Sequence, residues 1–108
     1  MSEVSNLFWL ALEMTGLGDE QVILEIASLV TDAELNILAE GPEIAVHRTA
    51  EEISRMEAWP AVQHKKSGLL DRVEASRTGV RKAERQTLDF LKKWVSENTA
   101  PFCGNSIW

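Results

Sequence analysis

One acidic side chain near the start of the chain is placed where it could do chemistry. Glu13 ends an apolar run that begins at Leu7, and a Thr-Gly turn follows it directly. Alternate residues of a strand share one face, so Ala11 and Glu13 project in the same direction. A buried carboxylate without compensation is costly, which favours a proton, a cation or a metal beside it. A metal site on this face would need a second carboxylate two residues earlier, where this sequence has Ala11.

Other polar residues allow simpler interpretations, and so does Glu13 itself. Glu13 could be a strand-end carboxylate that is solvated or hydrogen-bonded by the Thr-Gly turn. Glu25 lies inside an apolar strand and either pairs with a base or reaches solvent at an edge. His47 and His64 do not have the spacing of a metal pair, and His47 is interpreted as an ordinary strand residue. Cys103 is expected to be a small buried hydrophobe.

Composition limits the class of protein. With 108 residues, 44% of them hydrophobic, the chain can form one small domain with a limited core. The net charge of −6 argues against nonspecific binding to duplex DNA, but it does not exclude a small anionic ligand. A single cysteine excludes an intrachain disulfide and favours a reducing compartment. There is no apolar run long enough for a membrane span and no basic N-terminal signal, so a cytoplasmic protein is expected.

Three strand-like segments come first, at residues 7–12, 22–31 and 35–47. The glycines around Asp19 separate the first two, and residues 32–34 form a hairpin connection between the second and third. The second segment is rich in β-branched residues, although its apolar run would also suit a helix. Gly41 and Pro42 interrupt the third segment, which indicates an edge position or a bulge.

Helices are expected after residue 48, at about 50–59, 60–66, 69–75 and 79–97. Thr49 and Glu52 form a capping-box signature at the start of the first one. The last helix carries an apolar stripe at helical spacing, made up of Val80, Ala83, Thr87, Leu88, Leu91, Trp94 and Val95. A further strand is expected to start at about 102–107, just before the chain ends at Trp108. An order of three strands, helices and a strand normally continues with another helix that covers the sheet.

Several short runs now point to one family: Leu12-Glu-Met-Thr-Gly-Leu17, Glu25-Ile-Ala27, Leu35-Asn-Ile-Leu-Ala-Glu-Gly-Pro42, Ser67-Gly-Leu69 and Cys103-Gly-Asn-Ser-Ile107. From Asn6 onward the chain closely resembles the oligoribonucleases, which are 3′→5′ exoribonucleases of the DnaQ-like (DEDDh) superfamily. The resemblance implies an α/β (α+β) fold of the ribonuclease H-like type, with a mixed sheet and flanking helices. Residues 1–108 would then be a single, C-terminally truncated exonuclease domain.

The same resemblance implies an activity and partners. Family members are usually homodimers that degrade very short RNAs and linear dinucleotides with two divalent metal ions, Mg²⁺ or Mn²⁺. Two metals held by acidic side chains clamp the scissile phosphate and activate water, and a histidine acts as general base. Short RNA and a second copy of the chain are therefore the expected partners, without a membrane or duplex DNA.

The catalytic motifs of the family are only partly present. Glu13 matches the glutamate of the first Asp-x-Glu motif, a catalytic metal ligand, while Ala11 stands at the position of its aspartate. The second aspartate would follow Trp108, and the His-x4-Asp motif is absent. Losing one member of a concerted site usually lowers the rate by orders of magnitude. The chain alone is therefore expected to have no phosphodiesterase activity.

The substrate-binding positions of the family are better represented. By resemblance, Leu17 and Trp59 would pack on the bases, although Trp59 could equally anchor a helix on the core. His64 and Ser106 match positions that hold the 5′ phosphate of a dinucleotide. The same pocket would be lined by Met14, Thr15 and Asn105.

Two classes of explanation remain open. One is a truncated oligoribonuclease whose aspartate has become Ala11. The other is a noncatalytic module of that family that binds short RNA or pairs with a full-length subunit. In either case a sheet with one uncovered face favours oligomers, so the isolated chain is not expected to be a well-behaved monomer.

Overall fold

The computed structural model describes residues 6–94 and 102–106, and for the second range it gives the course of the backbone. Of the expected elements, residues 95–97 of the last helix and Ile107 of the last strand lie outside the described residues, as does Trp108.

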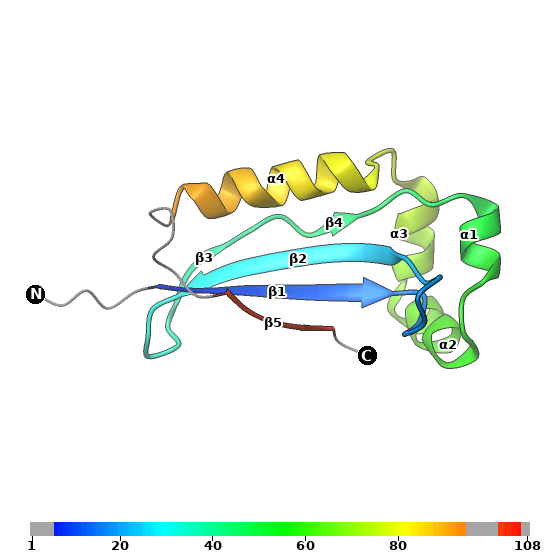
Figure 1. Cartoon of the computed structure of the whole chain (residues 1–108), viewed down its shortest axis with the longest axis horizontal. Coiled ribbons are helices and arrows are strands. Elements are labelled where there is room, and N and C mark those ends of the chain that lie inside the picture. Colours follow the sequence, from blue (N-terminus) through cyan, green and yellow to red (C-terminus); the bar gives the residue numbers. More distant parts are fainter. Residues whose placement is uncertain (1–5, 95–101, 107–108) are drawn as a thin grey trace, which may run out of the picture.

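A mixed sheet forms the centre of the fold (Figure 1). Its strands are β1 (Leu7–Met14), β2 (Ile23–Thr31), β3 (Ile37–Glu40), β4 (Ile44–Ala45) and β5 (Phe102–Ser106). They follow the order β3-β2-β1-β5, and β4 also pairs with β2. β1 runs antiparallel to β2 and parallel to β5, so β1 lies between an early and a late strand of the chain.

Among the described residues, four helices lie between β4 and β5 in the sequence: α1 (Ala50–Ser54), α2 (Ala58–Ser67), α3 (Leu69–Ala75) and α4 (Val80–Lys92). In Figure 1, α4 runs along the sheet, while α1, α2 and α3 gather beyond the end of β1. The result is an α+β fold with a mixed sheet and flanking helices, as the sequence predicted. None of the helices within the described part of the chain is long and apolar enough to cross a membrane.

Several segment boundaries differ from those expected. The last helix, expected to reach residue 97, ends at Lys92 with Lys93 as its C-cap. The strand expected at 7–12 continues to Met14, and the segment 35–47 is divided into β3 and β4. The turn that precedes β3 places Leu35 at a φ of 70°, a left-handed conformation that a continuous strand cannot contain. His47 follows β4 outside any strand, and its Nδ1 atom lies 3.1 Å from the carbonyl oxygen of Ser76.

The helix expected at 50–59 is wrong in extent. The capping box at Thr49 is present, with Glu52 bonded back to the Thr49 amide at 2.9 Å, but α1 ends at Ser54. A second helix, α2, starts at Ala58 and includes the whole expected segment 60–66. Pro60 falls in the first turn of α2, where the backbone amides lack intrahelical acceptors, so proline does not break the helix.

Gly68 separates α2 from α3 and explains why these two helices do not merge. It adopts a φ of 82°, a left-handed conformation that glycine reaches without steric penalty. Its amide bonds to the carbonyl of Lys65 at 3.2 Å and so closes α2.

Helix α4 covers one face of the sheet through a narrow stripe. Ala83, Thr87 and Leu91 are buried, four residues apart. The expected stripe was too wide, because Val80, Leu88 and Trp94 lie at its flanks and are exposed. Phe8 of β1 and the alternate residues Ile26 and Val30 of β2 complete this core, together with Ile44 of β4 and Val46 after it. A further cluster of Leu24, Leu69 and Val73 packs α3 against the start of β2.

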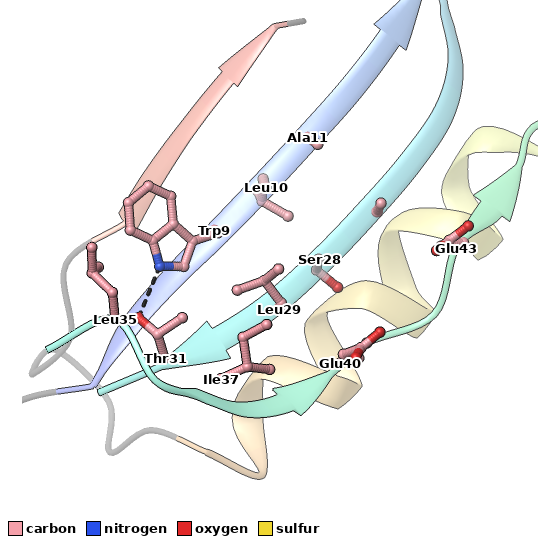
Figure 2. A pocket seen from close by; sticks show the side chains of 12 residues that line it. Trp9, Leu10, Ala11, Ser28, Leu29, Thr31, Leu35, Ile37, Glu40 and Glu43 are labelled. Carbon is pink, nitrogen blue, oxygen red and sulfur yellow. Dashed lines mark hydrogen bonds between the residues drawn. The ribbon is translucent and has the colours of Figure 1, made fainter. Parts of the chain in front are cut away.

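The opposite face of β1 carries Trp9, Ala11 and Glu13, the residues that alternate with the core positions. Across the β1–β2 ladder they meet Leu29, Ala27 and Glu25 in that order. Near the start of this face the indole Nε1 of Trp9 donates to the Thr31 hydroxyl at 3.0 Å (Figure 2). This face is apolar around Trp9 and carries two acids, Glu13 and Glu25, at its other end, where the helices α2 and α3 meet the sheet.

Candidate functional site

Glu13 and His64 face each other where β1 meets α2. The Oε2 atom of Glu13 lies 3.8 Å from Nδ1 of His64, and the histidine is buried while the glutamate is partly open. The other ring nitrogen of His64, Nε2, lies 2.8 Å from the carbonyl oxygen of Met14. A carbonyl only accepts, so this bond requires a proton on Nε2. In a neutral His64, Nδ1 is therefore an acceptor, and in a charged one it faces the Glu13 carboxylate as a donor.

The surroundings of Glu13 favour its protonated form. Burial is the largest effect and raises the pKa of the Glu13 carboxyl above its usual value. The nearby His64 acts in the opposite direction, and the like charge of Glu25 raises the pKa further. Glu13 is thus a carboxyl whose ionisation depends on neighbouring positive charge.

Glu25 is held by a base, which decides between the two alternatives left open by the sequence. It stands directly opposite Glu13 in the β1–β2 ladder. Its carboxylate forms an ion pair and hydrogen bond with Nη1 of Arg72, which extends from α3. The arginine offsets the repulsion that two carboxylates on one face would otherwise produce.

These residues line a pocket of about 310 Å³ at the junction of the sheet with α2 and α3. Its wall is formed by Glu13, Glu25, Trp59, Gln63, His64, Ser67, Leu69 and Arg72. The pocket combines two carboxylates, an imidazole, a guanidinium and an indole. It can accommodate a polar ligand that has both a flat apolar part and an anionic part.

The Thr-Gly turn lies beside this pocket. Thr15 is buried, and its hydroxyl accepts the Val22 amide at 2.9 Å, which closes the turn between β1 and β2. Leu17 is 75% exposed at the tip of the turn. Trp59 is 53% exposed, so the interpretation of Trp59 as an anchor in the core is wrong.

The sequence-predicted site residues fall into three groups. Glu13, Trp59 and His64 line the pocket. Met14, at the end of β1, and the turn residues Thr15 and Leu17 lie next to it. Asn105 and Ser106 belong to β5, in register with Ala11 and Leu12 of β1, and their side chains lie outside the described residues. The side chain of Cys103 also lies outside the described part of the chain, so its burial stays a prediction.

Ala11 does not join the pocket. It lines a separate hollow of about 440 Å³ on the same face of the sheet, together with residues such as Trp9, Leu29 and Ile37 (Figure 2). The methyl group of Ala11 has no atom that could bind a metal ion together with Glu13. The face is therefore apolar at the position where the sequence resemblance predicts an aspartate.

The pocket contains residues that the sequence did not single out as a site. Glu25 had a visible signal, a charge inside an apolar strand, and Ser67 and Leu69 belong to a run that carries the family resemblance. Gln63 and Arg72 had no such signal. They lie on α2 and α3, and the packing of Leu69 and Val73 against Leu24 brings α3 to Glu25.

The donor set does not fit a two-metal centre. Within residues 6–94, no group of three or more His, Cys, Asp or Glu side chains is arranged to hold a metal ion. Glu25 is engaged by Arg72, and Ala11 has no ligand atom. The role of Glu13 as a metal ligand therefore stays a prediction from the sequence resemblance.

Comparison with known proteins places this geometry in a family. A family model described as Exonuclease (RNase_T) matches residues 8–108. The chain belongs to this exonuclease family. Within the family, its sequence is 57% identical to the oligoribonuclease of Escherichia coli O157:H7 over 104 residues, which cover 95% of this chain and 58% of that protein.

Other relatives give the same result. The oligoribonuclease of Pseudomonas syringae pv. syringae is 52% identical over 108 residues, 99% of this chain and 61% of that protein. That of Haemophilus influenzae is 55% identical over 103 residues, 94% of this chain and 57% of that protein. The resemblance to oligoribonucleases is thereby confirmed. This exonuclease-family chain spans about three fifths of the length of the curated relatives it matches.

Proposed function

We propose that this exonuclease-family chain recognises short RNA ends or dinucleotides in the pocket beside Glu13 and does not hydrolyse them by itself. The observation that carries the proposal is that the pocket beside Glu13 is formed, whereas its side chains do not provide enough ligands for two metal ions. The Oε2 atom of Glu13 lies 3.8 Å from Nδ1 of His64, while Ala11, on the same face of β1 as Glu13, has no atom that could bind a metal ion. The similarity to oligoribonucleases supports short RNA as the ligand class.

The residues around the pocket suit the parts of a nucleotide. Leu17 and Trp59 expose apolar surface at its edge, and a base stacked on such a side chain gains about 1–3 kcal/mol. A protonated His64 would face a phosphate with Nδ1, because Nε2 is already bonded to Met14. Met14 and Thr15 hold the turn in place, and Asn105 and Ser106 would complete the pocket from β5.

Hydrolysis in this family would draw on two divalent ions, Mg²⁺ or Mn²⁺, which activate water and stabilise the leaving oxygen. The described residues of this chain do not fit such a pair of ions. We therefore expect no phosphodiesterase activity from the chain alone, in whatever compartment it acts. A cytoplasmic location is part of the proposal, because its single cysteine and its RNA ligands suit a reducing interior.

A second function is favoured by the hollow around Ala11. Its apolar lining, with Leu35 and Ile37 exposed, is a surface that a second polypeptide could cover. In this alternative the chain is a dimerisation module derived from the exonuclease family, and RNA recognition is secondary.

The decisive experiment titrates the chain and its Ala11→Asp variant with a 5′-phosphorylated diguanosine dinucleotide, with and without Mn²⁺. Calorimetry follows binding, and chromatography follows the release of mononucleotides. We expect the unmodified chain to bind the dinucleotide without a requirement for Mn²⁺ and to release no mononucleotide. Ala11→Asp should increase Mn²⁺ affinity, because it restores a carboxylate on the face of Glu13.

Ala27→Asp is the matched control, since Ala27 stands opposite Ala11 in the ladder and the change adds the same charge to the same face. It should raise Mn²⁺ affinity less than Ala11→Asp does. Metal-dependent release of mononucleotides by the unmodified chain would overturn the noncatalytic part of the proposal. Absence of dinucleotide binding under every condition would overturn the recognition part and favour the dimerisation module.

A further inference from the structure

Helix α2 and its N-cap residue are attached by hydrogen bonds to the last residue of β1 and to two residues of the turn that follows. His64 reaches the carbonyl of Met14, and Glu57 makes the other two bonds. The Glu57 amide donates to the carbonyl of Thr15 at 2.9 Å. The Glu57 carboxylate accepts the amide of Leu17 through Oε1 at 3.1 Å. Glu57 thus contacts the turn from both its backbone and its side chain.

We propose that Glu57 is a positioning residue that fixes the backbone of Leu17 relative to Trp59. It thereby sets the gap between the side chains of Leu17 and Trp59, which receives the bases of a dinucleotide. This inference rests on the proposed function, because that function makes Leu17 and Trp59 the base contacts. Glu57 lies outside the sequence runs that carry the family resemblance.

Glu57 is well placed to set this gap because it connects to both sides of it over short distances. It is the N-cap residue of α2, and its carbonyl accepts the Ala61 amide at 3.1 Å as the helix begins. Trp59 is the second residue of that helix, only two positions after Glu57. On the other side, Leu17 is 75% exposed, so core packing does not hold it. The bond from its amide to the Glu57 carboxylate is the contact that fixes its backbone against α2.

The side chain of Glu57 fits closely against the turn, which supports a specific arrangement. A Cβ atom added at Gly16 would meet the Cδ and Cγ carbons of Glu57 at 2.4 and 2.7 Å, well inside contact distance. A side chain at position 16 would therefore displace the Glu57 carboxylate from its place beside the Leu17 amide. The Thr-Gly-Leu sequence and Glu57 form one interlocking unit although they are 40 positions apart.

The test uses Glu57→Ala, which removes the carboxylate, and Glu57→Gln, which keeps an oxygen that can accept the Leu17 amide. Glu74→Ala is the control, an exposed glutamate on α3 outside the pocket. Each full chain is titrated with the 5′-phosphorylated diguanosine dinucleotide and with guanosine 5′-monophosphate. Amide hydrogen exchange at Leu17, followed by NMR, reports the hydrogen bond between the Leu17 amide and Glu57 in the absence of any ligand.

We expect Glu57→Ala to weaken dinucleotide binding by about tenfold, the effect of one lost hydrogen bond to a charged group. Its affinity for the monophosphate should change by less than about twofold, because a single base does not need both sides of the gap. Exchange at Leu17 should accelerate by about tenfold in Glu57→Ala, while Glu57→Gln and Glu74→Ala stay close to the unmodified chain.

The outcomes separate the two proposals. An equal loss of affinity for both ligands would reduce Glu57 to a general structural role and overturn the inference. Unchanged Leu17 exchange in Glu57→Ala would overturn it as well, whatever the ligands do. If the unmodified chain binds neither nucleotide, the proposed function fails, and with it the assignment of the gap to bases.

Discussion

The Nε2 atom of His64 lies 2.8 Å from the carbonyl oxygen of Met14, a residue 50 positions earlier in the chain. This bond places the centre of α2 against the last residue of β1 and turns Nδ1 towards Glu13. It also shows why a buried histidine is tolerated here, since its proton on Nε2 has an acceptor. His64 is therefore part of both the scaffold and the pocket.

Replacing His64 by alanine tests the structural half of that role. We expect His64→Ala to lower the free energy of unfolding by about 1–3 kcal/mol, because a buried side chain is removed and the partly buried Met14 carbonyl loses its partner. Urea unfolding followed by circular dichroism measures this change. His47→Ala serves as the control at an exposed histidine and should change the free energy of unfolding by about 0.5 kcal/mol or less. Equal effects of the two substitutions would contradict the assignment.

The local part of this architecture could be predicted from the sequence. Alternation along β1 placed Ala11 and Glu13 on one face, and the ladder confirms that they share it. The capping box at Thr49 predicted the start of α1 correctly, because its two hydrogen bonds join residues three apart. Signals of this kind depend on neighbours in the sequence, so no knowledge of the tertiary structure is needed.

The contacts that build the pocket could not be predicted in the same way. Glu25 and Arg72 are 47 positions apart, and Leu17 and Glu57 are 40 apart. Such pairs form only after the packing of α3 on Leu24 and of α2 on the β1 turn has fixed the distances. The resemblance to oligoribonucleases supplied Glu13, Trp59 and His64 as site residues, whereas Arg72 carries no local signal of its role.

Glu13 makes the stability of the fold depend on pH. Because its folded-state pKa lies above the usual value, the folded state holds this proton more tightly than the unfolded state does. The free energy of unfolding therefore falls as the pH rises from about 4.5 through the raised pKa of Glu13. Glu13→Gln removes this dependence, so the variant should gain stability relative to the unmodified chain between pH 4 and pH 7.

Urea unfolding at both pH values measures that gain. Glu74→Gln, at an exposed acid on α3, is the matched control and should show no comparable change with pH. If Glu13→Gln is stabilised equally at pH 4 and pH 7, burial does not govern the ionisation of Glu13.

The ion pair between Glu25 and Arg72 should contribute more than an ordinary surface pair. Glu25 is mostly buried and stands opposite Glu13, so loss of Arg72 leaves two carboxylates facing each other. A double-mutant cycle with Glu25→Ala and Arg72→Ala should give a coupling free energy of about 1 kcal/mol. The exposed pair between Glu51 of α1 and Arg55, the C-cap residue of that helix, should give about 0.3–0.5 kcal/mol in the same experiment. Coupling in the first pair no larger than in the second would contradict this prediction.

The uncovered face of the sheet should make the isolated chain self-associate. Leu35 and Ile37 are exposed beside the apolar hollow, and β3 ends the sheet among the described strands, so its outer edge can pair with another chain. Light scattering should show a mass that rises with concentration. Ile37→Lys should shift the chain towards monomer, because a lysine on an edge strand opposes strand pairing. Val62→Lys, at an exposed valine of α2 outside the hollow, should leave the mass unchanged. A sharp monomer at every concentration, with cooperative unfolding, would show that this face needs no cover.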